Sequence, residues 1–289
     1  MQEKAVAFPT DARLYHKARV ALVRVARPHQ IELRQSYTRK GKQALFMNNC
    51  YSAARQPLRA RRLKVYLGRV HQDLQRHLNT QSAAVQEQHA ALMLRVARIL
   101  AQQRADHNKV YSVHAPEVEC IAKGKVHKKY EFGVKVSLTA TQRDNFIVGA
   151  ASLPGNPYDG HTLHSALAQV KRLTGTAPEH CFVDRGYKGH GIKATAVHIP
   201  GQKRGVTHAL RRAIKRRNAI EPIIGHLKND GLLGRNLLKG ASGDAMNVIL
   251  AAAGHNLRII LRKLRLSWLQ ILRALLAETE LQLTVCATA

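Results

Sequence analysis

Residues 130–138, Tyr-Glu-Phe-Gly-Val-Lys-Val-Ser-Leu, follow the alternation expected of a strand. A period of two over this length predicts a half-buried strand, because successive side chains of a strand point to opposite faces. Residues 145–153 are rich in β-branched and apolar side chains, and the polar stretch 141–145 separates them from the first run. The two runs together predict a β-hairpin.

Segments of helix and strand character interleave after this hairpin. A helical pattern runs through residues 163–173, with Asp159 or Thr162 as its candidate N-cap. Short strands are predicted at 179–184 and 195–199, and helices dominate afterwards. This order of elements predicts an α/β fold with a mixed sheet and flanking helices.

The N-terminal third of the chain has a different character. Residues 1–110 carry 21 Lys and Arg against 6 Asp and Glu. Apolar residues recur there at spacings of three and four, which predicts amphipathic helices with basic outer faces. The stretch 36–57 is polar and interrupted, so we expect a loop and a short helix in it. The basic faces together predict DNA contact, although a solvated surface explains any single face equally well.

The whole chain has a formal charge of +29, from 47 Lys and Arg against 18 Asp and Glu. A field of one sign and this size favours a polyanionic partner, because cations that neutralise phosphates release condensed counterions. Nucleic acid is the leading partner. The alternatives are a ribosome-associated or other RNA-binding structural protein, and a protein attracted to anionic lipid. Neither alternative requires an acidic pair inside the core.

Several classes of protein are disfavoured by the sequence. The four cysteines are scattered singly, without zinc-site spacing, which fits a reducing cytoplasm. The apolar stretch 246–276 is interrupted by charges, so no membrane span is expected, and the N-terminus has no signal-peptide core. The glycines in 186–191 lack the rest of a phosphate-binding loop, so no nucleotide cofactor is expected. Trp268 and its apolar neighbours predict a packing face, with a coiled homodimer contact as the alternative.

Asp184 is the first candidate catalytic residue. It closes the predicted strand 179–184, and open α/β sheets place functional groups at the carboxyl ends of their strands. A carboxylate in this position suits a hard divalent cation such as Mg²⁺, which prefers oxygen ligands. A loop cap or a structural salt bridge is the alternative explanation.

Glu221 supplies a second carboxylate among cations. In a helix over residues 211–229, Arg217, Glu221 and Lys228 lie within about 40° of one another, so one stripe presents acid and cations together. Phosphoryl transfer uses such an arrangement, in which carboxylates hold metal ions and cations bind phosphate. The alternative is a surface ion pair between Arg217 and Glu221. Pro222 places Glu221 at a kink or at a helix start.

These motifs resemble a known family. Asp184-Arg-Gly-Tyr187 at a strand end, and Arg217, Glu221 and Lys228 at the spacing R-x3-E-x6-K, look like the second and third motif blocks of bacterial insertion-sequence transposases of the IS5/IS4-like group. The likeness covers residues 111–264. It implies a DDE catalytic domain of RNase H-like fold that cleaves DNA and transfers strands with Mg²⁺ or Mn²⁺.

The resemblance also implies roles for individual residues. Asp184 and Glu221 are the implied catalytic metal ligands, and Arg217 and Lys228 are the implied DNA-facing cations. The implied partners are the terminal inverted repeats of an insertion sequence and its target DNA, in the bacterial cytoplasm and associated with the nucleoid. We predict that further cations near these blocks also contact DNA: Arg185, Lys188, Arg211, Arg212, Lys215 and Arg216.

One departure from the family pattern is serious. The family carries its first catalytic Asp on the strand that opens the catalytic domain, but upstream of the hairpin this chain offers only Asp11, Asp73 and Asp106, none of them in a predicted strand. Residues 1–7 look like the tail of that strand, and Glu3 is a weak substitute for the missing acid. We therefore expect an N-terminally truncated transposase with an incomplete metal site, or, as the alternative, a non-catalytic DNA-binding remnant.

The predicted organisation has four parts. They are a remnant of the first catalytic strand (1–10), an inserted basic all-α subdomain (11–109), an RNase H-like catalytic core (110–240) and C-terminal helices (241–289).

Overall fold

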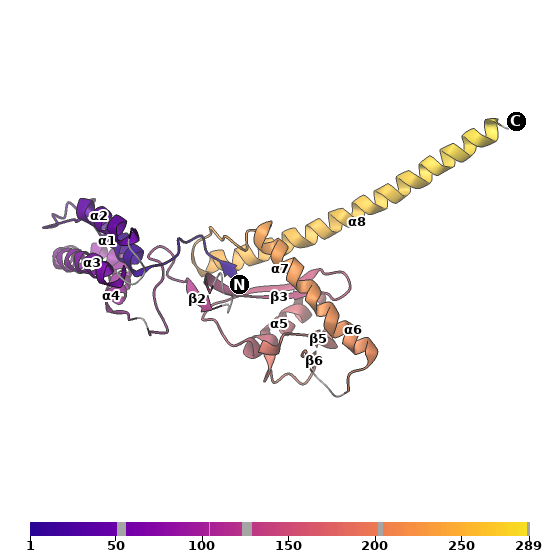
Figure 1. Ribbon diagram of the computed structural model, residues 1–289, viewed down its shortest axis with the longest axis horizontal. Coiled ribbons are helices and arrows are strands. Elements are labelled where there is room, and N and C mark those ends of the chain that lie inside the picture. Colours follow the sequence, from indigo (N-terminus) through magenta and orange to yellow (C-terminus); the bar gives the residue numbers. More distant parts are fainter. Residues whose placement is uncertain (51–55, 104, 123–128, 202–204, 288–289) are drawn as a thin grey trace. The chain divides into compact units, whose positions relative to one another are not determined.

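A computed structural model describes residues 1–50, 56–103, 105–122, 129–201 and 205–287 of the 289-residue chain, with only the backbone described for residues 274, 275 and 277–287. The chain divides into two compact units, each with its own core. We call residues 4–133 the N-terminal unit, and residues 1–3 with 134–289 the C-terminal unit. Figure 1 shows their elements.

The N-terminal unit is mainly helical. Its helices are α1 (Asp11–Ala26), α2 (Thr38–Asn49), α3 (Gln56–Leu78) and α4 (Ala83–Ala101). Thr10 caps α1 by accepting a hydrogen bond from the backbone N–H of Arg13. The apolar stripes of α1, α3 and α4 form one core around Leu22, Leu67 and Ile99, all fully buried. The predicted basic amphipathic helices are confirmed, as is a helix within 36–57; residues 51–55 lie outside the described part.

An ion pair between a buried carboxylate and an exposed arginine fixes the loop before α2 to α3. Asp73 is buried, and its carboxylate accepts hydrogen bonds from the backbone N–H of Arg34 at 2.7 Å and from the Arg34 Nε at 2.9 Å. Burial raises the pKa of the Asp73 carboxyl, but these hydrogen bonds outweigh burial and hold the pKa below its usual value. Asp73 therefore has a structural role in this helix bundle.

A four-stranded sheet contains β1 (Gln2–Glu3), β2 (Glu119–Ala122), β3 (Tyr130–Ala140) and β4 (Ile147–Leu153), in the order β1-β3-β2 with β4 also paired to β3. β2 pairs antiparallel with the first residues of β3, and β4 pairs antiparallel with the later ones. The predicted hairpin at 130–153 is thereby confirmed, with a register shift at Thr139/Ala140.

The remaining elements all belong to the C-terminal unit. They are α5 (Asp159–Thr174), β5 (His180–Phe182), η1 (Arg185–Tyr187), β6 (Ala196–His198), α6 (His208–Arg216), η2 (Arg217–Ala219), α7 (Ile220–Asn229) and α8 (Gly240–Ala287). Helices α5 and α8 both pack against β4. The core that β4 shares with α7 and α8 includes Ile147, Leu227 and Val248.

The sheet arrangement and the start of α5 differ from the sequence-based expectation. The sequence predicted one mixed sheet, whereas among the described residues β5 and β6 pair in parallel as a second, two-stranded sheet. Asp159 and Thr162 were the candidate N-caps of α5, but the N-cap is Tyr158, whose side chain makes no capping bond. The Tyr158 hydroxyl instead donates to the backbone carbonyl of Lys188 at 3.0 Å, which ties the start of α5 to the loop after η1.

A buried polar network holds β1 against α8. The side chain of Gln2 is almost fully buried; it donates to the backbone carbonyl of Asp244 and accepts from the Asn247 side chain, both at 2.9 Å. Asn236 donates to the Asp244 carboxylate at 2.6 Å and accepts from the N–H of Leu238 at 2.9 Å. These bonds fix the position of Glu3 beside the candidate site.

Among the helices of the described residues, none combines the length and the apolar character that crossing a membrane requires.

Candidate active site and basic surfaces

Asp184 follows the short parallel strand β5, as the sequence predicted. The pairing of β5 with β6 continues one residue further, since the N–H of Val183 donates to the carbonyl of His198 at 3.1 Å. The chain then turns into η1, and the backbone carbonyl of Asp184 accepts from the N–H of Tyr187 at 3.1 Å. The Asp184 side chain is left 67% exposed at the end of this strand.

Arg217 is the partner of Asp184. Its guanidinium Nη1 lies 2.7 Å from the Asp184 Oδ1, and its side chain is only 17% exposed. The Nε of Arg217 is buried without a hydrogen-bond partner among the described residues. The structure therefore brings together two of the predicted site residues, with Arg217 neutralising the carboxylate of Asp184.

The continuous helix predicted over residues 211–229 is interrupted. A 3₁₀ turn, η2, separates α6 from α7, and α7 begins at Ile220. Pro222 explains the new start, because proline lacks a backbone N–H and is tolerated in the first turn of a helix but not in its interior. Glu221 thus lies at a helix start, which was one of the two predicted outcomes.

Glu221 and Lys228 lie on α7 in different surroundings. Glu221 is exposed in the first turn, and among the described residues its side chain makes no ion pair or hydrogen bond. Lys228 is one quarter exposed, and its Nζ lies 3.8 Å from the Glu3 carboxylate. The backbone of Glu3 is fixed there, because its N–H donates to Leu233 and its carbonyl accepts from Asn236. Glu3, a weak candidate from the sequence, is therefore beside one motif residue.

The sequence-based reasoning missed a third acid–cation pair next to η1. The Nζ of Lys135 on β3 lies 2.6 Å from the Oδ1 of Asp159. A Cβ on Gly186 would come within 2.7 Å of the other carboxylate oxygen of Asp159, so Asp159 lies close to the turn that follows Asp184. Burial raises the pKa of the Tyr187 hydroxyl, and the charges of Asp159 and Asp184 raise it further. The sequence feature that pointed to this pair was Lys135, a charged residue within strand β3.

The residues present do not fit a complete metal site. The described residues contain no cluster of three His, Cys, Asp or Glu side chains that could hold a metal ion. The carboxylate of Asp184 faces Arg217, and the carboxylate of Glu3 faces Lys228. In this arrangement Asp184 and Glu3 are paired with cations and are not grouped as metal ligands.

The other predicted DNA-binding cations are mostly exposed. Lys188 follows η1, and these further cations are also exposed: Arg185, Arg211, Arg212, Lys215 and Arg216. Arg216 differs from the rest because its guanidinium donates to the backbone carbonyls of Gln142 and Arg143 at 3.0 and 3.1 Å. Arg216 thereby fastens α6 to the turn of the hairpin, and its donors are partly used by the fold.

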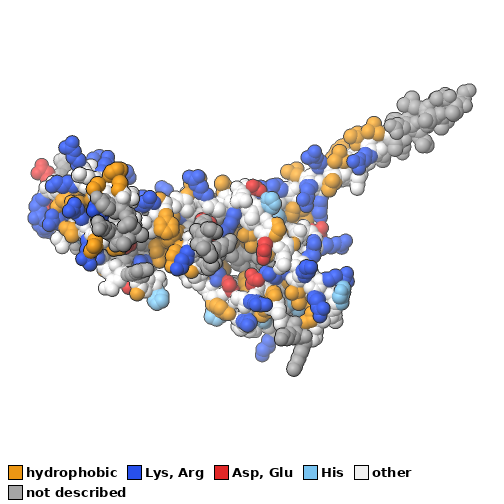
Figure 2. Space-filling model, viewed as in Figure 1, with side chains coloured by type: hydrophobic (Ala, Val, Ile, Leu, Met, Phe, Trp, Pro, Cys, Tyr) orange, Lys and Arg blue, Asp and Glu red, His pale blue; other side chains and the backbone are white. Residues whose placement is uncertain are grey.

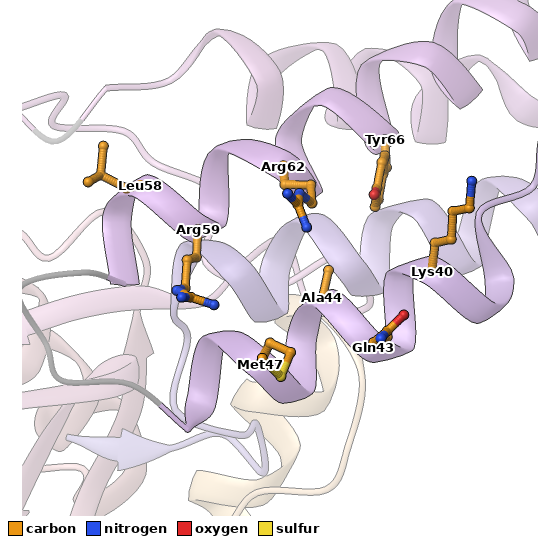
Figure 3. Close-up of a pocket in the computed structure, with 8 residues that line it drawn as sticks. All are labelled: Lys40, Gln43, Ala44, Met47, Leu58, Arg59, Arg62 and Tyr66. Atoms are coloured by element: carbon orange, nitrogen blue, oxygen red, sulfur yellow. The ribbon is translucent and has the colours of Figure 1, made fainter.

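A second basic surface lies in the N-terminal unit. A cavity of about 760 Å³ opens between α2 and α3, and Figure 3 shows its lining. Three cations, Lys40, Arg59 and Arg62, surround an apolar floor that includes Met47, with Tyr66 at one side. Figure 2 shows Lys and Arg side chains over much of the visible surface of these helices. Cations beside an aromatic ring are a combination suited to nucleic acid.

Comparison with known proteins agrees with the motifs. A family model described as "Transposase DDE domain" matches residues 104–257, more than half of the chain, and includes Asp184, Arg217, Glu221 and Lys228. A protein of Rhizobium meliloti named "Uncharacterized protein ORF8 in nfe locus" is 57% identical over 56 residues, which are 19% of this chain and 27% of that protein. The chain thus matches about a quarter of that relative's length. No solved structure matches. The extent of the family match shows that this chain belongs to the transposase DDE domain family.

Proposed function

We propose that this chain is a DNA transposase of the IS5/IS4-like insertion-sequence group whose strand cleavage is impaired because its metal site is incomplete. The observation that carries the proposal is the grouping of Asp184 with Arg217, and of Lys228 with Glu3, within one unit of a DDE family member. The substrates in this proposal are terminal inverted repeats and target DNA, and Asp184 and Glu221 are the catalytic carboxylates.

The proposed domain plan follows the sequence. Residues 110–240 form the RNase H-like core in this plan, and residues 11–109 form a basic helical insertion between its first strand and its hairpin. The exposed cations of α6 and the basic cavity of the N-terminal unit support DNA as the partner. In this proposal both surfaces bind the phosphate backbone, which sets affinity but not sequence preference.

Impairment follows from the acids that are present. DDE chemistry needs carboxylates that hold metal ions around the reacting phosphate. Among the described residues no third acid completes a cluster with Asp184 and Glu221. An aspartate placed by design on a strand added ahead of β1 would lie near this group of residues, because β1 lies beside Lys228 through Glu3. The Mg²⁺ or Mn²⁺ site of this chain is incomplete in this proposal.

The second candidate function is a non-catalytic DNA-binding protein. The ion pair between Asp184 and Arg217 favours it, because a carboxylate already neutralised by an arginine has less need of a metal ion. Such a protein would bind insertion-sequence ends or DNA of any sequence. It would also block assembly of an active transposase by occupying those ends.

Nicking of supercoiled DNA in Mn²⁺ or Mg²⁺ distinguishes the two candidates. The unextended chain is compared with the same chain extended by a strand that carries Asp, each with Asp184→Ala and Glu221→Ala controls. Nicking only after extension, lost in both controls, supports the impaired transposase. No nicking by either form, with DNA binding intact, supports the binding protein. Nicking by the unextended chain that both substitutions abolish contradicts impairment.

Competition between duplex DNA and structured RNA tests the choice of nucleic acid. The transposase proposal expects duplex DNA to displace labelled duplex DNA more effectively than RNA of equal charge does. Preference for RNA, together with binding that is insensitive to Asp184→Ala and Glu221→Ala, would identify an RNA-binding structural protein and contradict the proposal.

A further inference from the structure

Helix α8 carries a continuous row of exposed apolar side chains. They are Leu250, Leu257, Leu261, Leu264, Trp268 and Ile271, and each is between 50% and 70% exposed. With Gly254 included, the steps along this row alternate strictly between four and three residues. A side chain built on Gly254 would meet nothing within 4 Å, so the row is uncovered there as well. We call these seven positions the α8 seam.

The opposite side of α8 packs against the C-terminal unit itself. Val248, Ala252 and Ile259 are buried there. Asn256 bonds the backbone of Ile147 through both atoms of its amide, at 2.8 and 2.9 Å. Lys263 pairs with Asp144 at 2.9 Å. One side of the helix is therefore fixed to the hairpin, and the seam faces away from it.

Alternation of four and three is the repeat of a coiled coil, since two apolar residues in every seven keep one stripe facing a partner helix. From Leu250 to Ile271 the seam covers three repeats, or about 32 Å of helix at 1.5 Å per residue. Figure 2 shows apolar side chains on the part of α8 that extends beyond the sheet, with grey atoms further along. An uncovered apolar stripe of this length marks an interaction surface.

We propose that the α8 seam is a dimer interface and that its occupant is the α8 seam of a second copy of this chain, aligned in parallel. A seam with a regular repeat is complementary to itself, as a two-fold interface requires. The inference rests on the geometry of α8 and does not depend on the proposed function.

The charge pattern beside the seam favours the parallel arrangement. On one flank lie Arg258 and Arg265, and the matching positions of the other flank are Ile260 and Ser267. A parallel pair sets each flank against the opposite flank of its partner, so that Arg265 faces Ile260 without repulsion. An antiparallel pair sets the arginine flank against itself. Like charges at close range disfavour that arrangement.

The mass of the full chain in solution, measured by sedimentation velocity over a concentration series, tests the interface. We expect a species of twice the 32.2 kDa chain mass at micromolar concentration. The double substitution Leu261→Glu/Leu264→Glu should weaken dimerisation by at least about 100-fold, because residues at the centre of an interface dominate its affinity. Both leucines are exposed, so helicity by circular dichroism should not change.

Leu266→Glu/Leu269→Glu is the matched control. These leucines are also exposed and belong to the same helix, but they lie off the seam. The control should keep the dimer. A monomeric parent chain, or a dimer weakened equally by both double substitutions, would overturn the proposal; in the first case the seam would have a different occupant, such as another protein or a lipid surface.

Two further measurements test orientation and separate self-association from DNA binding. Leu250→Cys should crosslink to itself across a parallel dimer, with the linked peptide identified by mass spectrometry; crosslinking of Leu250→Cys to Ile271→Cys in mixed dimers, without self-linkage, would overturn the parallel alignment. Added salt should strengthen dimerisation, because it screens the repulsion between two chains of charge +29 each. DNA binding should weaken in the same salt series.

Discussion

The carboxylate of Asp184 lies 2.7 Å from the guanidinium of Arg217, so the acid that follows β5 and the first cation of the R-x3-E-x6-K spacing neutralise each other. The two residues are predicted to have separate roles, one at a metal ion and one on DNA. In the structure the two side chains are instead paired with each other. Any ligand of either residue must compete with this ion pair.

Asp184→Asn should strengthen binding to nonspecific duplex DNA. The substitution removes the negative charge and leaves Arg217 free to contact a phosphate. One added phosphate contact makes the slope of log affinity against log salt steeper by about 0.9. Fluorescence anisotropy over a salt series measures the slope. Asp230→Asn, at an exposed carboxylate whose partner is His226, is the control and should change the slope less. A slope unchanged or shallower in Asp184→Asn argues against Arg217 as a DNA contact.

Asp73→Asn should destabilise the N-terminal unit at neutral pH and remove part of its acid sensitivity. The pKa of Asp73 is lowered in the folded chain from its ordinary 3.8, so its stabilisation is present above that value and is lost as the pH falls through the folded pKa. The loss at neutral pH should be about 2 kcal/mol, the size of a hydrogen bond to a charged group.

Hydrogen exchange of α3 at several pH values, followed by mass spectrometry, reports this effect within the full chain. Asp106→Asn is the matched control, since Asp106 is exposed and, among the described residues, its carboxylate accepts a hydrogen bond only from the N–H of Gln103. Equal exchange in the two variants would contradict a special role for Asp73.

Gly186→Ala should disturb the turn that follows Asp184. The new Cβ would lie 2.7 Å from the Asp159 carboxylate, which is held by Lys135, so the turn or the ion pair must move. We expect a loss of about 1–3 kcal/mol in stability, typical of overpacking. Thermal unfolding of the two variants gives the comparison. Gly225→Ala is the control, because its Cβ would meet nothing within 4 Å in α7 and should be neutral or stabilising. An equal change in thermal stability in both variants would refute the close approach of Gly186 to the Asp159 carboxylate.

Asn256→Ala should loosen α8 from the edge of β4. The side chain of Asn256 accepts from the N–H of Ile147 and donates to its carbonyl, and alanine leaves both backbone groups without this partner. The cost should be about 1–3 kcal/mol. Chemical denaturation followed by the fluorescence of Trp268 and by circular dichroism measures it. Asn229→Ala, at an exposed position of α7, is the control and should cost less than half as much. A similar cost at both sites would show that the hydrogen bonds of Asn256 do not hold α8 to β4.

Local patterns were sufficient for much of the C-terminal unit. The alternation through β3 and the apolar run of β4 are properties of neighbouring residues, so the hairpin could be predicted without knowing its surroundings. The same holds for the basic amphipathic helices. Pro222 fixed the start of α7 through its missing N–H, and the placement of Asp184 after β5 followed from the position of a short apolar run.

Contacts between distant residues could not be predicted in this way. Lys135 meets Asp159, and Gln2 meets Asn247 at the other end of the chain, because packing places their elements together. No local periodicity encodes such a pair, since its energy depends on which side chains are buried near each other. The division of strands into two sheets was decided likewise by the tertiary structure.

The sequence by itself determined the family motifs, the charge and the order of strands and helices, because each of these is a property of composition or of short-range spacing. Only the tertiary structure decided which acid faces which cation. Arg217 could have paired with Glu221 four residues away, but the 3₁₀ turn η2 changes its direction, and its guanidinium lies instead against Asp184.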